Sequence, residues 1–173
     1  MGSTRLASTS DSESRRAPAG NTMSQKFTDF LKSQNLNFDI NTFSESTCTS
    51  ADAAAALNCQ LGQIAKSLIF RIKNNTPLLI ITSGSNRVDE NKIETLIGQQ
   101  ISQADADFVQ IHTGYIIGGI PPFGFLQPIK TFIDRDLLQY SVIWSAAGDP
   151  HSVFSLSPQN LIHVTRGIIV CVK

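Results

Sequence analysis

The centre of this chain contains the apolar run Gln63-Ile64-Ala65-Lys66-Ser67-Leu68-Ile69-Phe70. Side chains of a β-strand alternate between its two faces, so Ile64, Lys66 and Leu68 share one face. A lysine therefore stands where an apolar residue would suit a core, and burying its ammonium without a partner is costly. Either Lys66 points outward from a strand edge, or its charge meets an anionic partner in a functional site.

The flanking residues extend this run into a β-hairpin. We expect strands at 64–72 and 77–82, joined by the turn Lys73-Asn74-Asn75-Thr76. Similar β-rich runs predict further strands at 37–43, 129–133, 141–144, 153–156 and 168–172. Trp144 is apolar and lies in one of these runs, so we expect it in the core.

Helical spacing of apolar residues alternates with these strands. It predicts helices at 24–34, 50–57, 89–97, 103–111 and 158–164. The expected N-caps are Ser24, Ser50 and Asp89, and Pro158 occupies a first helical position. Helix 89–97 is expected to bury Ile93, Leu96 and Ile97. Many strands with short helices predict an α+β fold, a single domain with a mixed, mostly antiparallel β-sheet and flanking helices.

The chain has 173 residues, which suits one ordinary domain with a full core. Hydrophobic residues make up 41% and charged residues 16%, a composition typical of globular proteins. Residues 1–23 differ, because they are rich in Ser, Thr, Arg, Ala and Gly and show no periodicity. We expect them to be a disordered tail, either native or left by cloning, and residues 24–173 to form the domain.

Charge and cysteine content narrow the partners and the compartment. Fourteen basic and fourteen acidic residues give a formal net charge of zero, whereas proteins that grip long nucleic acids are usually basic. Any RNA contact is therefore expected to be small or shared with a partner. No apolar run approaches the roughly 20 residues that span a bilayer, so no membrane partner is expected. Three widely spaced cysteines favour a reducing cytoplasm, and neither they nor the histidines show metal-ligand spacing, so no metal and no cofactor are expected.

A glycine- and proline-rich loop provides a second candidate feature, with the sequence Gly118-Gly119-Ile120-Pro121-Pro122-Phe123-Gly124. Glycines leave backbone amides accessible where side chains would block close approach. A cation and free amides are suited to a polarised carbonyl or a phosphate. Lys66 and this loop together therefore point to a functional site.

Two other segments can be interpreted either as functional or as purely structural. In Ser83-Gly84-Ser85-Asn86-Arg87, Asn86 and Arg87 either border a ligand or belong to a plain strand-to-helix turn. His151 stands at the start of a strand, either as a general acid or base or as a solvated loop residue. No nucleophile elbow and no phosphate-binding loop are present in the sequence.

Several motifs, in order along the chain, resemble the YbaK/ProRS-associated editing family. They are IAKSLIF (64–70), TSGSNRVD (82–89), TGYIIGGIPPFG (113–124), YSVIWSAAG (140–148) and FSLSP (154–158). The resemblance covers about Met23 to Lys173. It implies a YbaK-like fold and an enzyme that hydrolyses amino acids wrongly attached to tRNA, typically tRNA for proline.

The resemblance also implies roles for individual residues. Lys66 corresponds to the family's essential lysine, and Gly118-x-x-x-Pro122 to its GxxxP loop. By analogy, the amides of Gly118 and Gly119 meet the ester carbonyl and Lys66 fixes the terminal adenosine and its phosphate. Pro121 and Pro122 would stiffen the loop, and Ile120 and Phe123 would shape the amino-acid pocket unless they are core residues. Water or a ribose hydroxyl would attack, with no protein nucleophile.

The sequence departs from this family at one segment. YbaK-type enzymes carry Ser-Gly-Gly followed by an Asp, whereas the equivalents here are Ala146-Ala147-Gly148 and Val153. Alanine-editing members place a histidine near this segment, and His151 lies several residues away. The amino acid removed, whether Cys, Ser, Thr or Ala, therefore stays open.

Three functional hypotheses follow. The first is a cytoplasmic trans-editing deacylase acting on the 3′ end of mischarged tRNA, with a synthetase as a potential second partner. The second is a non-catalytic module that binds an RNA 3′ end or a synthetase, which the departures at Ala146 and Val153 motivate. The third is a hydrolase of free aminoacyl esters.

Overall fold

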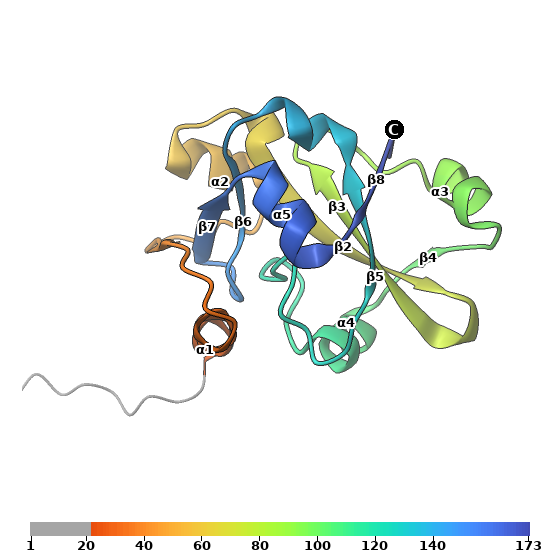
Figure 1. The fold of residues 1–173 in the computed structure, drawn as a ribbon, viewed down its shortest axis with the longest axis horizontal. Coiled ribbons are helices and arrows are strands. Elements are labelled where there is room, and N and C mark those ends of the chain that lie inside the picture. Colours follow the sequence, from red (N-terminus) through yellow and green to blue (C-terminus); the bar gives the residue numbers. More distant parts are fainter. Residues whose placement is uncertain (1–21) are drawn as a thin grey trace, which may run out of the picture.

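The computed structural model describes residues 22–173, which fold around one eight-stranded sheet (Figure 1). The helices are α1 (Met23–Ser33), α2 (Ser50–Leu57), α3 (Glu90–Ile97), α4 (Ala106–Thr113) and α5 (Pro158–Thr165). The strands are β1 (Ile40–Thr42), β2 (Ile64–Ile72), β3 (Thr76–Ser83), β4 (Ser102–Gln103), β5 (Lys130–Asp134), β6 (Ile143–Ala146), β7 (Ser152–Leu156) and β8 (Ile168–Val170).

Strands β2 and β3 form the predicted hairpin at the middle of the sheet. They pair antiparallel along their whole length, with Lys66 opposite Thr82. Asn74 and Asn75 in the turn adopt positive φ angles of 61° and 54°, a conformation that asparagine tolerates better than most residues. The sheet order is β1-β7-β6-β2-β3-β5-β8, and β4 also pairs with β2. Within residues 22–173, four strand pairs are antiparallel and three are parallel, which confirms the predicted mixed α+β fold.

Helices cover both faces of the sheet (Figure 1). On one face, α1, α4 and α5 pack on a large core that includes Phe27, Phe108 and Leu161. On the other face, Ile93 of α3 packs in a second cluster, and Ala53 and Ala54 of α2 pack against Ile64. The alternating side chains of β2 supply both faces, as expected of a central strand.

Most helix boundaries follow the sequence signals, but two N-caps differ. Thr22, rather than Ser24, caps α1 by accepting a hydrogen bond from the Gln25 N–H at 3.1 Å. Thr49, rather than Ser50, caps α2 in the same way. Each helix thus begins at or before the serine, because the preceding threonine keeps extended backbone and offers its hydroxyl first. Asp89 caps α3 as predicted.

Other local predictions were wrong in part. The expected helix 103–111 is displaced, because residues 102–103 pair with β2 and Asp105 caps a helix that begins at Ala106. The expected strand 37–43 shortens to Ile40–Thr42. Leu96 is 56% exposed rather than buried, since only Ile93 of α3 points fully into the core.

The N-terminal boundary is described only in part. Met23 already belongs to α1, so the expected tail of residues 1–23 overlaps the domain by two residues and otherwise lies outside the described residues. Among the helices of residues 22–173, none combines the length and the apolar character that crossing a membrane requires.

Candidate active site

Strand β2 has an open stretch of edge in the middle of the sheet. Its pairing with β6 ends at Ala65, and its pairing with β4 begins at Phe70. Within residues 22–173, no strand lies beside positions 66–69 on this edge. An open strand edge presents peptide N–H and C=O groups to whatever occupies the space.

Ser67 directs its peptide groups into this gap. The carbonyl of Ala65 accepts a hydrogen bond from Ser145 Oγ at 3.2 Å, and that of Ile69 accepts one from the Ala104 N–H at 3.3 Å. Peptide groups alternate between the two edges of a strand, so Ser67 faces the same edge as these two residues.

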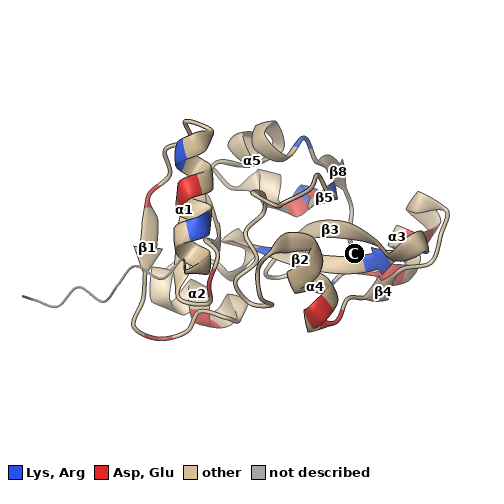
Figure 2. Ribbon diagram, turned by 90° about the horizontal axis from the view of Figure 1, so that it is seen from below, with Lys and Arg blue, Asp and Glu red and all other residues tan. Residues whose placement is uncertain are grey.

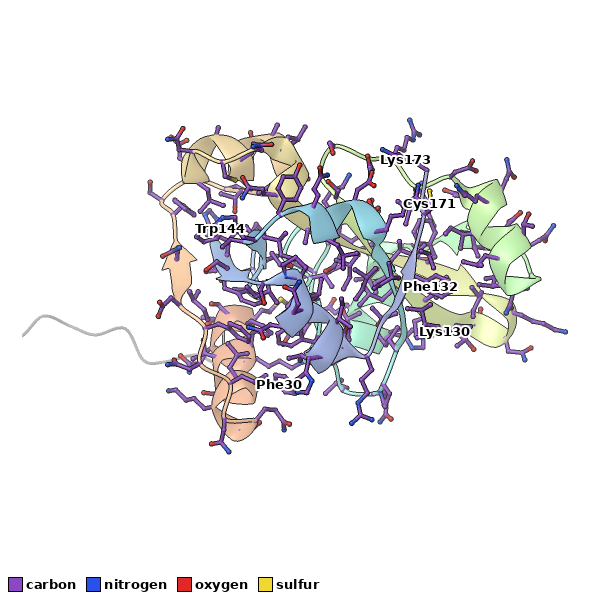
Figure 3. All side chains as sticks on the ribbon, turned by 45° about the horizontal axis from the view of Figure 1, so that its top comes forward. Phe30, Lys130, Phe132, Trp144, Cys171 and Lys173 are labelled. Atoms are coloured by element: carbon purple, nitrogen blue, oxygen red, sulfur yellow. The ribbon has the colours of Figure 1, made fainter. Side chains whose placement is uncertain are left out.

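A cavity of about 170 Å³ lies at the gap. Its wall consists of residues 64–68 of β2, residues 47–50 and Ala53 at the start of α2, residues 144–146 of β6, Val153 of β7, and Ile117, Gly118 and Ile120 of the glycine-rich loop. Trp144, labelled in Figure 3, packs beside α2 and is partly exposed. The expectation that it is a core residue is therefore corrected, since its ring forms part of the cavity wall.

Lys66 contributes the only ammonium group of this wall within residues 22–173. Its Nζ donates to the backbone carbonyl oxygen of Asn86 at 3.5 Å. The two ion pairs of residues 22–173, Arg71–Asp105 and Lys173–Asp136, do not include it. Burial lowers the pKa of Lys66 because it disfavours the charged form. The site therefore holds a partly desolvated cation that no carboxylate of the described chain neutralises.

A buried carboxylate fixes the backbone that contacts Lys66. Asp134 is 1% exposed, and its Oδ2 accepts hydrogen bonds from Asn86 Nδ2 at 2.8 Å, Ser83 N at 3.0 Å and Thr82 Oγ1 at 3.2 Å. Asn86 Nδ2 also donates to Asp136 Oδ2 at 2.8 Å. The hydrogen bond from Lys173, followed by that from Asn86, holds the pKa of Asp136 below its usual value. These bonds from Nδ2 hold Asn86 in place, and with it the backbone carbonyl that accepts from Lys66.

The glycine-rich loop is anchored at its C-terminal end. Tyr115 is fully buried, and its hydroxyl donates to the Gly124 carbonyl at 3.3 Å. Burial raises the pKa of Tyr115 to about 12, so the hydroxyl stays protonated and keeps this bond. Phe123 packs in an aromatic cluster with Phe27 and Phe154. These contacts fix the position of Phe123 and Gly124.

The two adjacent glycines of the loop have different reasons to be glycine. Gly118 has a φ of +94°, and a Cβ there would lie 3.3 Å from Cys48 Sγ. Gly119 packs so closely that a Cβ would fall 2.6 Å from Asp149 Cα. The N–H of Gly119 already donates to the Ile116 carbonyl at 3.1 Å, whereas that of Gly118 has no partner in residues 22–173.

The structure brings three of the ten predicted site residues to the cavity, namely Lys66, Gly118 and Ile120. The other seven lie outside its wall. Asn86 contacts Lys66 only through its carbonyl oxygen, and Arg87 is exposed on the turn. Four loop residues are buried, namely Gly119, Pro121, Pro122 and Phe123. Phe123 packs in the aromatic core because burial of apolar surface is favourable.

His151 also lies away from the cavity. Its side chain is exposed, while its carbonyl accepts from the Phe43 N–H at 2.8 Å and its N–H donates to Asp149 Oδ1 at 2.7 Å. The backbone of His151 therefore joins the segment before α2 to the start of β7. Its ring has no place in the cavity wall.

Sequence reasoning missed several wall residues, chiefly Cys48, Ser50, Ser67 and Ile117. Ser67 carried a signal, since it is a second polar residue beside Lys66 in an apolar run. Cys48 and Ser50 carried none, because the fold alone brings the start of α2 beside β2. No Asp, Glu or His belongs to this wall within the described chain, so its polar groups are hydroxyls, the Cys48 thiol, one cation and backbone amides.

Charges are interspersed over the rest of the molecule. In Figure 2, α1 carries both basic and acidic residues, whereas α4 shows an acidic residue only. In the part of the chain that the structure describes, no group of three or more His, Cys, Asp or Glu residues is placed to hold a metal ion.

Comparisons with known proteins identify the class of this domain. The family model for the aminoacyl-tRNA editing domain matches residues 44–164, so the chain belongs to this family. The chain is therefore an aminoacyl-tRNA hydrolase that acts in editing.

Individual relatives agree with this class. In sequence, the chain is 32% identical to a proposed trans-editing enzyme for prolyl-tRNA synthetase. The crystal structure of that enzyme matches with a TM-score of 0.83, over 87% of this chain and 96% of that one. It is 27% identical to the hypothetical protein APE2540, with a TM-score of 0.78 over 85% and 98% of the two chains. It is 30% identical over 127 residues to the uncharacterized protein YwhH of Bacillus subtilis strain 168, covering 73% of this chain and 81% of the relative.

Proposed function

We propose that this protein removes small non-cognate amino acids (Cys, Ser, Thr or Ala) from mischarged tRNA-Pro in trans, in the cytoplasm. The observation that carries the proposal is that Lys66 and Gly118 line one small cavity, to whose wall residues 22–173 contribute no carboxylate and no imidazole. Such a site suits an ester that is already activated by its ribose. The similarity to a proposed trans-editing enzyme for prolyl-tRNA synthetase supports tRNA-Pro as the carrier.

In the proposed mechanism, the terminal ribose ester enters the cavity and water attacks its carbonyl carbon. The tetrahedral intermediate then breaks the bond between this carbon and the ribose oxygen. The ribose oxygen leaves as a hydroxyl with a proton that the attacking water gives up, and the free amino acid is released. The N–H of Gly118, which has no partner among the described residues, donates to the oxygen that becomes negative in the tetrahedral intermediate. One such donor is worth about 2.7–4 kcal/mol in other enzymes. The Lys66 ammonium binds the terminal adenosine phosphate and adds positive potential, and its partial desolvation strengthens that interaction.

The need for this activity is energetic. A synthetase pocket gains only about 1–3 kcal/mol of discrimination from a single methylene, so a second site must remove the remaining errors. The formal net charge of zero favours weak tRNA binding through the acceptor end, which a synthetase partner would strengthen.

Deacylation of tRNA-Pro charged with Cys, Ser, Thr or Ala tests the proposal. We expect turnover of at least one substrate, and a loss of at least about a hundredfold in kcat/KM in Lys66→Ala. Lys73→Ala is the matched control, because Lys73 lies on the exposed β2–β3 turn. Turnover of none of the four, with retained binding of tRNA or synthetase, would support the non-catalytic module instead. Cleavage of free aminoacyl esters at rates independent of tRNA identity would support the third hypothesis.

A further inference from the structure

Ser67 carries a backbone donor and a backbone acceptor on the open edge of β2. Its N–H and C=O face the gap, and neither forms a hydrogen bond with another group of residues 22–173. The carbonyls on either side are satisfied, because that of Ala65 accepts from Ser145 Oγ and that of Ile69 accepts from the Ala104 N–H. Backbone polar groups shielded from bulk water are normally paired, so the peptide groups of Ser67 are suited to a ligand.

A second cavity, of about 210 Å³, lies along this edge. Four successive residues of β2, 67–70, line it. Because their side chains alternate between the two faces of the sheet, the cavity borders the edge of the strand and not one face. The two cavities share Ser67, Leu68, Ile117 and Ile120. A ligand held in the first cavity can therefore extend into the second.

The wall of the second cavity differs from that of the first, because it carries no charged side chain within the described chain. Apart from Ser67, its one polar side chain there is Gln103, whose amide already donates to Glu90 Oε1 at 3.3 Å. The remaining wall is apolar, and Ile117, at the boundary of the two cavities, is 57% exposed. Such a cavity disfavours a phosphate or an ammonium group and favours a neutral ring.

Adenine matches both the polar edge and the apolar wall. Its ring presents an acceptor nitrogen beside the donor amino group at position 6. The Ser67 N–H can donate to the ring nitrogen while the Ser67 C=O accepts from the amino group, so one residue satisfies both. Bases held outside a helix are typically recognised in this way, with hydrogen bonds at the edge of the ring and apolar side chains over its faces.

We propose that the second cavity binds the terminal adenine of the mischarged tRNA, with the peptide groups of Ser67 pairing with its edge and Ile117 covering one of its faces. This inference rests on the proposed function and deepens it. An adenine on this edge leaves its ribose ester at the adjoining first cavity, which contains Lys66 and Gly118. The base and the amino acid would thus be recognised in separate cavities on one strand.

Nucleosides that carry an amide-linked alanyl group on the 3′ position test this role with the wild-type protein. We expect the adenosine derivative to bind at least about tenfold more tightly than the inosine derivative, which has an acceptor oxygen at position 6 and a donor at position 1. The purine riboside derivative lacks the amino group and should bind at least about threefold more weakly than the adenosine derivative. Equal affinities for the adenosine and inosine derivatives would overturn the inference while leaving the editing function intact.

Ile117→Ala tests the apolar side of the same cavity. In deacylation of mischarged tRNA-Pro, we expect KM to rise at least about threefold and kcat to change less than about twofold, because the variant loses apolar contact with the base. Ile111→Ala is the matched control, since Ile111 is 72% exposed on α4 and lines neither cavity. An unchanged KM in Ile117→Ala, or a loss confined to kcat, would overturn the inference. Turnover of no mischarged tRNA-Pro at all would instead overturn the proposed function, and the inference with it.

Discussion

The Nζ of Lys66 lies 3.5 Å from the backbone carbonyl oxygen of Asn86, and no carboxylate of residues 22–173 forms an ion pair with it. Asn86 donates to the buried Asp134, so the position of the ammonium depends on the hydrogen bonds that Asp134 accepts. A carbonyl contact orients a cation without neutralising it. The charge therefore stays available to an anionic ligand.

The lowered pKa of Lys66 should appear in the pH dependence of catalysis. The charged fraction of Lys66 falls as pH rises through its folded-state pKa, which lies below 10.5. After subtraction of spontaneous ester hydrolysis, we expect kcat/KM of the wild type to decline on the alkaline side. Lys66→Arg keeps its charge in this range and should lack the decline. Parallel alkaline declines in both proteins would show that another group titrates.

Partial burial of the Lys66 ammonium should also lower the stability of the folded protein at neutral pH. The folded-state pKa of Lys66 lies below 10.5, so between the two pKa values the unfolded chain binds more protons and wild-type stability rises with pH. Lys66→Met should be more stable at pH 7 by about 0.5–1 kcal/mol, a small gain because the side chain is partly solvated. This advantage should vanish above pH 10.5 in urea titrations. A Met variant that is less stable at pH 7 would contradict the prediction.

Asp134 should be important for the stability of the β3 end. Asp134→Asn removes acceptor capacity from a buried group that receives hydrogen bonds from Ser83 N and Asn86 Nδ2. We expect a loss of about 2–4 kcal/mol in the free energy of unfolding, measured by urea denaturation. Asp107→Asn, on the exposed first turn of α4, is the control and should change stability by less than about 0.5 kcal/mol. A small effect at Asp134 would mean that the network is replaceable.

Gly119 should tolerate no side chain. Gly119→Ala places a Cβ about where Asp149 backbone lies, 2.6 Å from its Cα, so the loop must move. We expect a loss of about 1–3 kcal/mol in stability and reduced deacylation. Gly98→Ala is the matched control, because its φ is +70° and no atom lies within 4 Å of the added Cβ. That variant should lose about 1 kcal/mol through backbone strain and keep its activity. Equal losses at both positions would exclude the packing explanation.

Local sequence signals predicted much of this fold. The β-rich apolar run predicted β2 at Ile64–Ile72, and the run of alanines predicted the helix at Ser50–Leu57, both with the observed bounds. Strand alternation was the basis for a further expectation. It also placed Lys66 with Ile64 and Leu68 on one face. These predictions succeeded because strand period and helix propensity act over a few residues.

The residues that form the cavity wall could be predicted from the sequence only in part. The gap beside Ser67 exists because β6 and β4 pair with opposite ends of β2, and these partners lie far apart in the sequence. Pro122 was expected at the substrate, and Phe123 was left open between the amino-acid pocket and the core. In the structure Phe123 packs against Phe154 and other core aromatics. Tertiary packing, which no local pattern encodes, decides which side of a loop faces the cavity.

The interrupted edge of β2 also bears on how this protein avoids unwanted association. A long exposed strand edge invites pairing with other chains. Here the stretch without a neighbouring strand covers only four positions, Lys66 to Ile69, between two paired segments of the same strand, and the Ile69 carbonyl already accepts from the Ala104 N–H. A small extended ligand fits such an interval, whereas a strand from another protein would collide with β6 or β4. The sheet can thus offer backbone recognition to its substrate without becoming a template for aggregation.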